Sequence, residues 1–177
     1  MQDPKHDEKD HIKNYSGEDA VKKLKELAEK ARTCMFVTLT ETRPLPARPM
    51  ALQGIDDNGI LYFFSTATSN KNYEIQNDPH VQLFFENNGH SEYLSVYGKA
   101  VISRDRDKIG QLWTPMAKAW FHDGPDDPDL TLISVTPEDC SYWDTKHNRM
   151  VALLKIAVSM ATGKTMDDGV EGKLEVG

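Results

Sequence analysis

The sequence predicts one mainly β (α+β) domain, a small antiparallel β-barrel with flanking helices. Three observations carry this prediction. A chain of 177 residues fits one ordinary globular domain. Short runs of β-branched and aromatic residues, each bounded by turn residues, recur through the middle of the chain. At least six strands at this length close most simply into a barrel, because closure removes the exposed sheet edges.

The N-terminal part predicts a tail followed by a helix. Residues 1–15 are almost all polar or charged and lack an apolar targeting segment, so we expect a flexible tail. Ser16 and Asp19 have the spacing of a capping box, which predicts a helix over residues 16–32. Its apolar residues recur at helical spacing: Val21, Leu24, Leu27, Ala28 and Ala31.

The middle of the chain predicts the strands. Five apolar runs read MFVTLT, RPMALQGI, ILYFFS, VQLFFE and YLSVYGKAVIS, and 130–135 predicts a sixth. Asp57-Asn58-Gly59 predicts a tight hairpin between the second and third runs, because Asn-Gly readily adopts positive φ. A short helix should lie between Ser65 and Pro79. The pattern does not determine the strand order.

The C-terminal third predicts helix, strand and tail in turn. Residues 104–113 favour a helix, and 114–130 favour mixed helix and loop. The apolar segment 150–161 is too short to span a bilayer and predicts a docking helix. Residues 163–177 are polar and glycine-containing, so we expect a second flexible tail after a folded domain over 16–162.

Charge and cysteine content exclude several classes of function. Twenty-one basic and 28 acidic residues give a net charge of −7, which argues against nucleic-acid or membrane-surface binding. The two cysteines form no framework of disulfides, so a reducing cytoplasm is the expected compartment. The acidic loop over 122–129 lacks the spacing of a calcium loop, and no metal site is predicted.

One constellation could bind an anion. Arg48, Pro49 and Met50 lie on the predicted second strand, whose hairpin partner leads into a helix start. Hydroxyls and free N–H groups at such a start form an anion site, and Arg48 and Lys71 could supply two positive charges. The alternative is that the polar residues only cap the helix and that the basic ones are solvated. The helix-start residues are Ser65, Thr66, Ser69, Asn70 and Lys71.

At this point the motifs indicate a family. The pattern ARPMALQ, then LYFFSTATSNKNYEIQNDPHVQLFFE, then YLSVYGKA resembles the split-barrel flavin-binding proteins related to pyridoxamine 5′-phosphate oxidase. The later part, LWTPMAKAWFHDGPDDPDLTLISVTPEDCSYWD, resembles the bacterial general stress protein 26 type. The resemblance covers about residues 17–162. It implies a six-stranded antiparallel split barrel and a homodimer that binds flavin mononucleotide (FMN) in clefts between its subunits.

The resemblance also implies roles for residues near the flavin. Arg48 matches an arginine that helps hold the phosphate, and 49–53, with Pro49, Met50 and Ala51, match the strand along the isoalloxazine ring. Phe64 and Ser65 match a second flavin contact. Thr66, Ser69, Asn70 and Lys71 fall at the phosphate, with Asn70 replacing an arginine of the oxidases. Trp113 and Trp120 are candidates to cover the ring from the partner chain, with an ordinary core or interface role as the alternative, which is favoured for Trp143.

Two functions follow from this resemblance. The first is an FMN-dependent oxidoreductase linked to the general stress response, in which the flavin performs the chemistry and no catalytic side chain is identified. The second is a non-enzymatic protein that binds or sequesters flavin or another planar ligand. Tyr93 replaces a flavin-contacting glutamine, and the substrate-binding arginine and histidine of the oxidases have no match, so vitamin B6 oxidation is not predicted. FAD, a deazaflavin or haem remain alternative cofactors.

Overall fold

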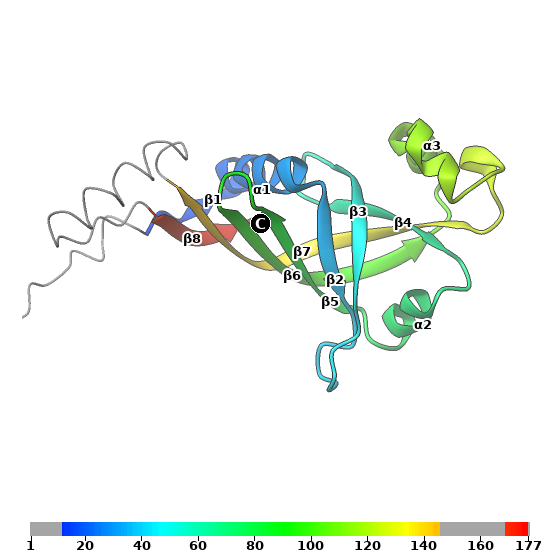
Figure 1. Ribbon diagram of the computed structural model, residues 1–177, viewed down its shortest axis with the longest axis horizontal. Coiled ribbons are helices and arrows are strands. Elements are labelled where there is room, and N and C mark those ends of the chain that lie inside the picture. The colour runs from blue at the N-terminus through cyan, green and yellow to red at the C-terminus, as the bar shows by residue number, and fades with distance from the viewer. Residues whose placement is uncertain (1–11, 146–168, 177) are drawn as a thin grey trace, which may run out of the picture.

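Six antiparallel strands close into a barrel. The computed structural model describes residues 12–145 and 169–176 (Figure 1). Neighbouring strands follow the order β7-β4-β3-β2-β5-β6, and pairing of β6 with β7 closes the ring. This confirms the six-stranded antiparallel barrel. The strands are β2 (Thr33–Val37), β3 (Ala47–Ile55), β4 (Leu61–Thr66), β5 (His80–Asn87), β6 (Glu92–Ser103) and β7 (Leu130–Thr145).

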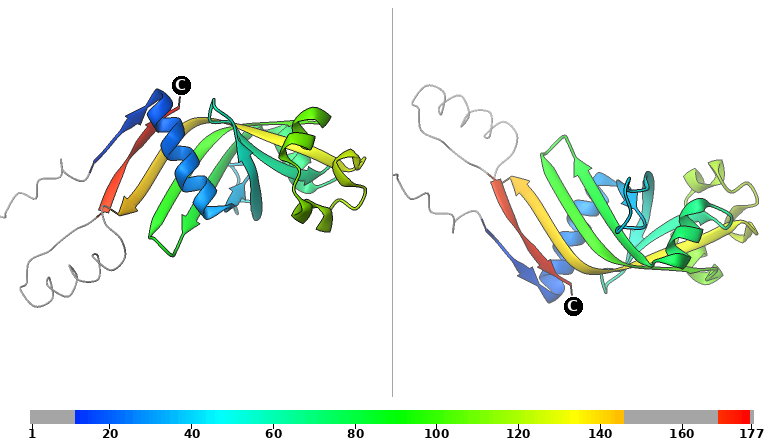
Figure 2. Two further views of the ribbon diagram at one scale, coloured as in Figure 1. Left: turned by 90° about the horizontal axis from the view of Figure 1, so that it is seen from above. Right: turned by 90° about the horizontal axis from the view of Figure 1, so that it is seen from below.

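Both expected tails contribute to the sheet, which corrects the sequence prediction. Strand β8 (Gly169–Glu175) pairs with β7, and the two-residue β1 (Tyr15–Ser16) pairs in parallel with β8 (Figure 2). The Tyr142 hydroxyl donates to the Lys13 carbonyl over 2.6 Å. Leu174 is buried, but its neighbours in β8 are mostly polar, so the segment carries no clear strand signal. The expected docking helix over 150–161 lies outside the described residues.

In the described part of the chain, three α-helices flank the barrel. Helix α1 (Gly17–Ala31) confirms the first predicted helix, and it buries Leu24 and Leu27 in the barrel core. Ser16 stands at its N-cap without a side-chain hydrogen bond, so the expected capping box does not form. Helices α2 (Asn70–Asn77) and α3 (Arg106–Leu112) lie near the other end of the barrel, where α2 confirms the helix expected before Pro79 (Figure 1).

Two hydrophobic cores lie on opposite faces of β4. The barrel interior contains Phe36 and Phe63, whose rings meet edge to face with centroids 5.3 Å apart. On the outer face, Phe64 packs with Ile109 of α3 and with Phe121, which follows the short turns of η2 (Pro115–Ala119). A further turn, η3 (Gly124–Asp126), precedes β7. Burial on both faces explains why the β4 segment is continuously apolar.

The hairpin between β3 and β4 forms at the predicted place, but of Asn58 and Gly59 only Gly59 has positive φ. The Asp56 carboxylate accepts from the backbone N–H groups of Asn58 and Ile60 over 2.9 and 3.0 Å, and Gly59 has φ +80°. Cys34 and Cys140 are buried and unpaired, and burial raises the pKa of each thiol to about 12. Among the described residues, no helix combines the length and apolarity needed to cross a membrane.

Candidate functional site

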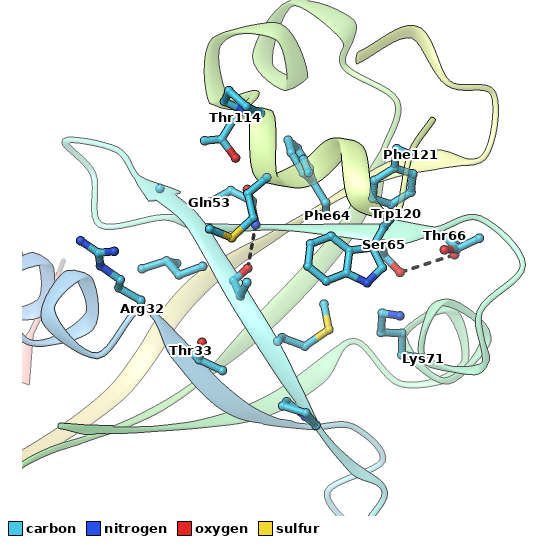
Figure 3. Close-up of a pocket in the computed structure, with 18 of the residues that line it drawn as sticks. Arg32, Thr33, Gln53, Phe64, Ser65, Thr66, Lys71, Thr114, Trp120 and Phe121 are labelled. Carbon is cyan, nitrogen blue, oxygen red and sulfur yellow. Dashed lines mark hydrogen bonds between the residues drawn. The ribbon is translucent and has the colours of Figure 1, made fainter. Parts of the chain in front are cut away.

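A cleft of about 920 Å³ opens between β3 and the η2 segment (Figure 3). Its floor is the outward side of β3, and its opposite wall is the chain from 114 to 121. The start of α2 lies at one end, and the junction of α1 with β2 contributes the other lining residues. The lining includes Arg32, Thr33, Pro49, Met50, Ala51, Gln53, Phe64, Ser65, Thr66, Lys71, Thr114, Met116, Trp120 and Phe121.

Strand β3 supplies a flat, narrow floor. Side chains alternate along a strand, so Pro49 and Ala51 both point outward and are exposed. The pairing with β4 shifts between Leu52 and Gly54, which marks a bulge at Gln53. The Gln53 amide donates to the Ala51 carbonyl over 3.1 Å. Small side chains and an irregular edge leave room for a planar group along this strand.

Aromatic side chains border the cleft on the η2 side. Phe64 contacts Phe121 edge to face, with ring centroids 6.3 Å apart, and Trp113 in a tilted arrangement at 6.0 Å. Trp120 lines the cleft with 69% of its surface exposed. Such an exposed indole in a cleft gains from stacking against a planar ligand or from burial by a partner.

A buried polar network fixes the start of α2 at the cleft. Asn72 lies on α2 and is buried, and its amide oxygen accepts from the Ser65 hydroxyl over 2.8 Å. The Asn72 amide nitrogen donates to Thr131 of β7 over 3.1 Å, and the Thr131 hydroxyl donates to the Ser65 carbonyl over 2.8 Å. Ser65 and Ser69 also share a hydrogen bond of 3.0 Å. Lys71 is therefore held on a rigid helix.

Lys71 is the positive charge at this end of the cleft. Its ammonium has no ion pair or hydrogen bond with the described residues. Burial lowers its pKa and the nearby Arg48 guanidinium lowers it further, while Glu74 acts in the opposite direction. A partly buried cation without a counterion favours an anionic ligand, because such a ligand would restore the lost solvation.

Arg48 has a different environment from the one expected. Its guanidinium donates to the Glu74 carboxylate and to the Thr38 hydroxyl, each over 2.6 Å. It therefore ties β3 to α2 and is not among the residues that line the cleft. Burial alone would raise the pKa of Glu74, but hydrogen bonds from Thr38 and Arg48 hold it below its ordinary value of 4.5.

Eight of the twelve predicted site residues line the cleft: Pro49, Met50, Ala51, Phe64, Ser65, Thr66, Lys71 and Trp120. The remaining four do not: Arg48, Ser69, Asn70 and Trp113. Ser69 precedes α2 and Asn70 begins it, whereas Trp113 packs against Phe64 from the second core. Tyr93 lies on β6, also outside the lining.

Sequence reasoning missed several cleft residues. Arg32 and Thr33 follow α1 and lie far in sequence from the other motifs, and Thr114 and Phe121 lie in a segment of irregular pattern. Asn72 was also missed as the residue that anchors α2. One signal was present. An asparagine near the start of a helix, after a hydroxyl-rich loop, often forms side-chain hydrogen bonds with groups nearby in the sequence.

The arrangement suits a planar aromatic ligand with an anionic tail. The ring would lie along β3 between Pro49, Ala51 and the aromatic wall, and the tail would reach Lys71 and Thr66. The volume is within the range of cofactor sites. Among the described residues, those that line the cleft include no histidine, cysteine or tyrosine, and its ionisable side chains are Glu29, Arg32 and Lys71.

Comparison with curated proteins gives two relatives. Protein bli-3 of Neurospora crassa is 32% identical over 134 residues, which cover 71% of this chain. This chain spans 64% of the length of that protein. General stress protein 26 of Bacillus subtilis is 30% identical over 100 residues, which cover 55% of this chain and 71% of the relative.

Comparison with solved structures supports the same relationship. A general stress protein 26 structure from Jannaschia sp. CCS1 is 25% identical with a TM-score of 0.75, and the match covers 89% of this chain and 98% of that one. The general stress FMN/FAD binding protein of Xanthomonas citri is 27% identical with a TM-score of 0.60, covering 71% and 87%. The family described as pyridoxamine 5′-phosphate oxidase like matches residues 19–167. The chain therefore belongs to the pyridoxamine 5′-phosphate oxidase-like family, among relatives of general stress protein 26.

Proposed function

We propose that this protein binds FMN in the cleft between β3 and η2 and serves as a flavin-dependent oxidoreductase. The observation that carries the proposal is the cleft itself, in which an apolar slot ends at the unpaired ammonium of Lys71. A flavin has the matching shape, since a planar ring system carries a phosphate at the end of its side chain. The relative from Xanthomonas citri, described as an FMN/FAD binding protein, supports this choice and keeps FAD as an alternative.

The flavin would supply the electron transfer, and the protein would supply binding and orientation. Lys71 and Thr66 would hold the phosphate, the outward side of β3 would support the ring, and Trp120 would border it. Vitamin B6 oxidation is not part of the proposal, because the substrate-binding arginine and histidine of the oxidases find no match in the sequence.

We also propose a homodimer with the cleft at its interface. Exposed outward side chains lie on five neighbouring strands, and the set is offset between β5 and β6, where Phe84 pairs with Ser95 and Tyr93 pairs with Glu86. Met35 lies opposite both Pro49 of β3 and Phe84 of β5, and Tyr93 lies opposite Trp143. Because Pro49 also lines the cleft, a partner seated on this outward row would lie against the site. The outward row consists of Pro49, Met35, Phe84, Tyr93 and Trp143.

The alternative function is a non-enzymatic protein that stores or sequesters the flavin. One observation favours it, namely that the described part of the cleft offers no histidine, cysteine or tyrosine for proton transfer. Anaerobic mixing of the FMN-loaded protein with reduced nicotinamide separates the two. Reduction of the bound flavin, with about one donor molecule oxidised per flavin, supports the enzyme, and a bound flavin that stays oxidised supports the carrier.

Binding itself is tested with Lys71→Met. We expect the variant to bind FMN at least tenfold more weakly than the parent, because a charge-assisted contact contributes about 1.5–3 kcal/mol. Riboflavin, which lacks the phosphate, should bind both proteins alike. Quenching of flavin fluorescence measures both affinities, and Lys22→Met, an exposed lysine of α1, is the matched control. Equal loss for FMN and riboflavin would contradict a phosphate contact at Lys71.

A further inference from the structure

The cleft contains a second basic residue, Arg32, which comes from a different element. Arg32 stands between the end of α1 and the start of β2, whereas Lys71 is on α2 (Figure 3). Its backbone is fixed on both sides. The Arg32 N–H donates to the Ala28 carbonyl over 2.9 Å, and its carbonyl accepts from the Leu52 N–H of β3 over 2.8 Å. These two bonds fix the main chain of Arg32 at the edge of the cleft.

The backbone at Arg32 favours a residue other than arginine. It has φ +63° and ψ −26°, the left-handed conformation that usually ends a helix at glycine. A residue with a Cβ is strained there, and such strain is found where the side chain has a role. The guanidinium makes no ion pair or hydrogen bond with the residues that the structure describes. Arg32 is exposed, so its guanidinium is accessible to a ligand that enters the cleft.

Glu29 is the acidic residue of the cleft, one turn before Arg32 on α1. It reduces the local positive potential but does not pair with Arg32, since no contact within 4.0 Å joins them. An anion that docks at Arg32 would therefore bind more tightly once Glu29 is neutral. Replacing Glu29 by a neutral residue should therefore raise the affinity for an anion, whereas replacing Arg32 should lower it.

We propose that Arg32 is a substrate-docking residue that binds an anionic group, a carboxylate or phosphate, of the molecule that exchanges electrons with the flavin. The inference rests on the proposed function, which occupies the Lys71 end with the cofactor phosphate and leaves Arg32 for a second reactant. Arg32 and Lys71 lie on either side of β3 in the same cleft. The flavin and the second reactant would therefore bind side by side along this strand. The substrate class is thus small organic anions with a planar or apolar body.

Benzoate and its neutral isostere benzamide are the probes, and isothermal titration calorimetry of the FMN-loaded protein is the measurement. We expect benzoate to bind at least tenfold more tightly than benzamide. Arg32→Gly should abolish this preference, and it should raise the melting temperature because glycine suits the positive φ. Glu29→Gln should tighten benzoate binding several-fold. Arg104→Gln, an exposed arginine outside the cleft lining, is the matched control.

Equal binding of the two probes, or a benzoate preference that survives Arg32→Gly, would overturn the proposal. The flavin-free protein separates this failure from failure of the proposed function. If the chain does not bind FMN, a benzoate preference that survives Lys71→Met but not Arg32→Gly still supports the anion site. If FMN binds and Arg32→Gly changes only the melting temperature, Arg32 is a helix-ending residue and the docking role is wrong.

Discussion

At the scale of single residues, Arg48 and Lys71 carry the same charge but have different partners. Both were expected to meet one phosphate. Arg48 instead pairs with Glu74 and Thr38, whereas Lys71 remains unpaired in the cleft. Because the guanidinium already satisfies a carboxylate, its release toward a ligand would cost the free energy of that pair. In the proposed FMN site, the phosphate would therefore be held by Lys71 rather than by Arg48.

The Glu74 pair makes stability depend on acid pH. Hydrogen bonds and the Arg48 charge hold the folded pKa of Glu74 below 4.5, so the unfolded chain takes up this proton first. Its stabilisation is fully present above the unfolded pKa and is lost as pH falls through the folded pKa. We expect Glu74→Gln to lower the free energy of unfolding by about 1–2 kcal/mol at pH 7. The difference from the parent should shrink as pH falls below 4.5.

Urea denaturation at a series of pH values measures this effect. Glu86→Gln, which changes an exposed carboxyl on β5, is the control and should change the free energy of unfolding little at any pH. A Glu74→Gln difference that does not shrink at any pH below 4.5 at which the protein stays folded would contradict the ionic origin of the contribution.

The sequence identified Lys71 and not Arg32 for a physical reason. Lys71 lies next to the hydroxyls and helix start that predict an anion site, so local pattern is enough. Arg32 reaches the cleft only because β2 and β3 pair, which places Thr33 opposite Ala51. A residue whose function arises from strand pairing leaves no local signal, and the same holds for Thr131 beside Asn72.

At the scale of elements, α2 depends on one buried amide. Asn72 bridges β4 and β7 through Ser65 and Thr131, all three of which are buried. Asn72→Ala should lower the free energy of unfolding by about 2–3 kcal/mol, because it leaves two buried hydroxyls with fewer partners. Thermal or urea unfolding checks this. Asn77→Ala, at the exposed end of α2, should cost less than 0.5 kcal/mol, and equal costs would contradict the bridging role.

Strand β8 is the element that the sequence least predicts, and one glycine tests its packing. A Cβ on Gly172 would lie 2.1 Å from the Lys13 carbonyl oxygen, whereas one on Gly110 of α3 would meet nothing within 4 Å. We expect Gly172→Ala to destabilise the protein and Gly110→Ala to stabilise it by about 0.5–1 kcal/mol. Melting temperatures of the two variants measure the contrast. A neutral Gly172→Ala would contradict the close approach of residues 12–16 to β8.

At the scale of the whole molecule, the closed barrel and most of its strands follow from the sequence, while the strand order and the full length of β7 do not. The five apolar runs and the Asp57-Asn58-Gly59 turn have local signals that β2 to β6 confirm. Strand β7 was expected only over 130–135, since its later residues, such as Pro137 and Glu138, do not look like strand. Pairing of β7 with β6, β4 and β8 provides the register that local pattern lacks.

Assembly into a homodimer can be tested at the outward row. Met35 and Phe84 lie opposite one another on β2 and β5, both exposed, and Met35 also adjoins Pro49 of the cleft floor. A carboxylate at each position would oppose its copy across a twofold interface, where burial of like charges is costly. We expect Met35→Glu with Phe84→Glu to halve the mass measured by analytical ultracentrifugation. FMN affinity should fall together with the mass, because the cleft would lose the wall that the partner supplies.

Val101→Glu, which changes an exposed apolar residue outside the row, should leave the mass and the FMN affinity unchanged. A double variant that stays dimeric would place the interface elsewhere, and a parent that sediments as a monomer would rule it out. In either case the cleft would have to bind its flavin with the residues of one chain.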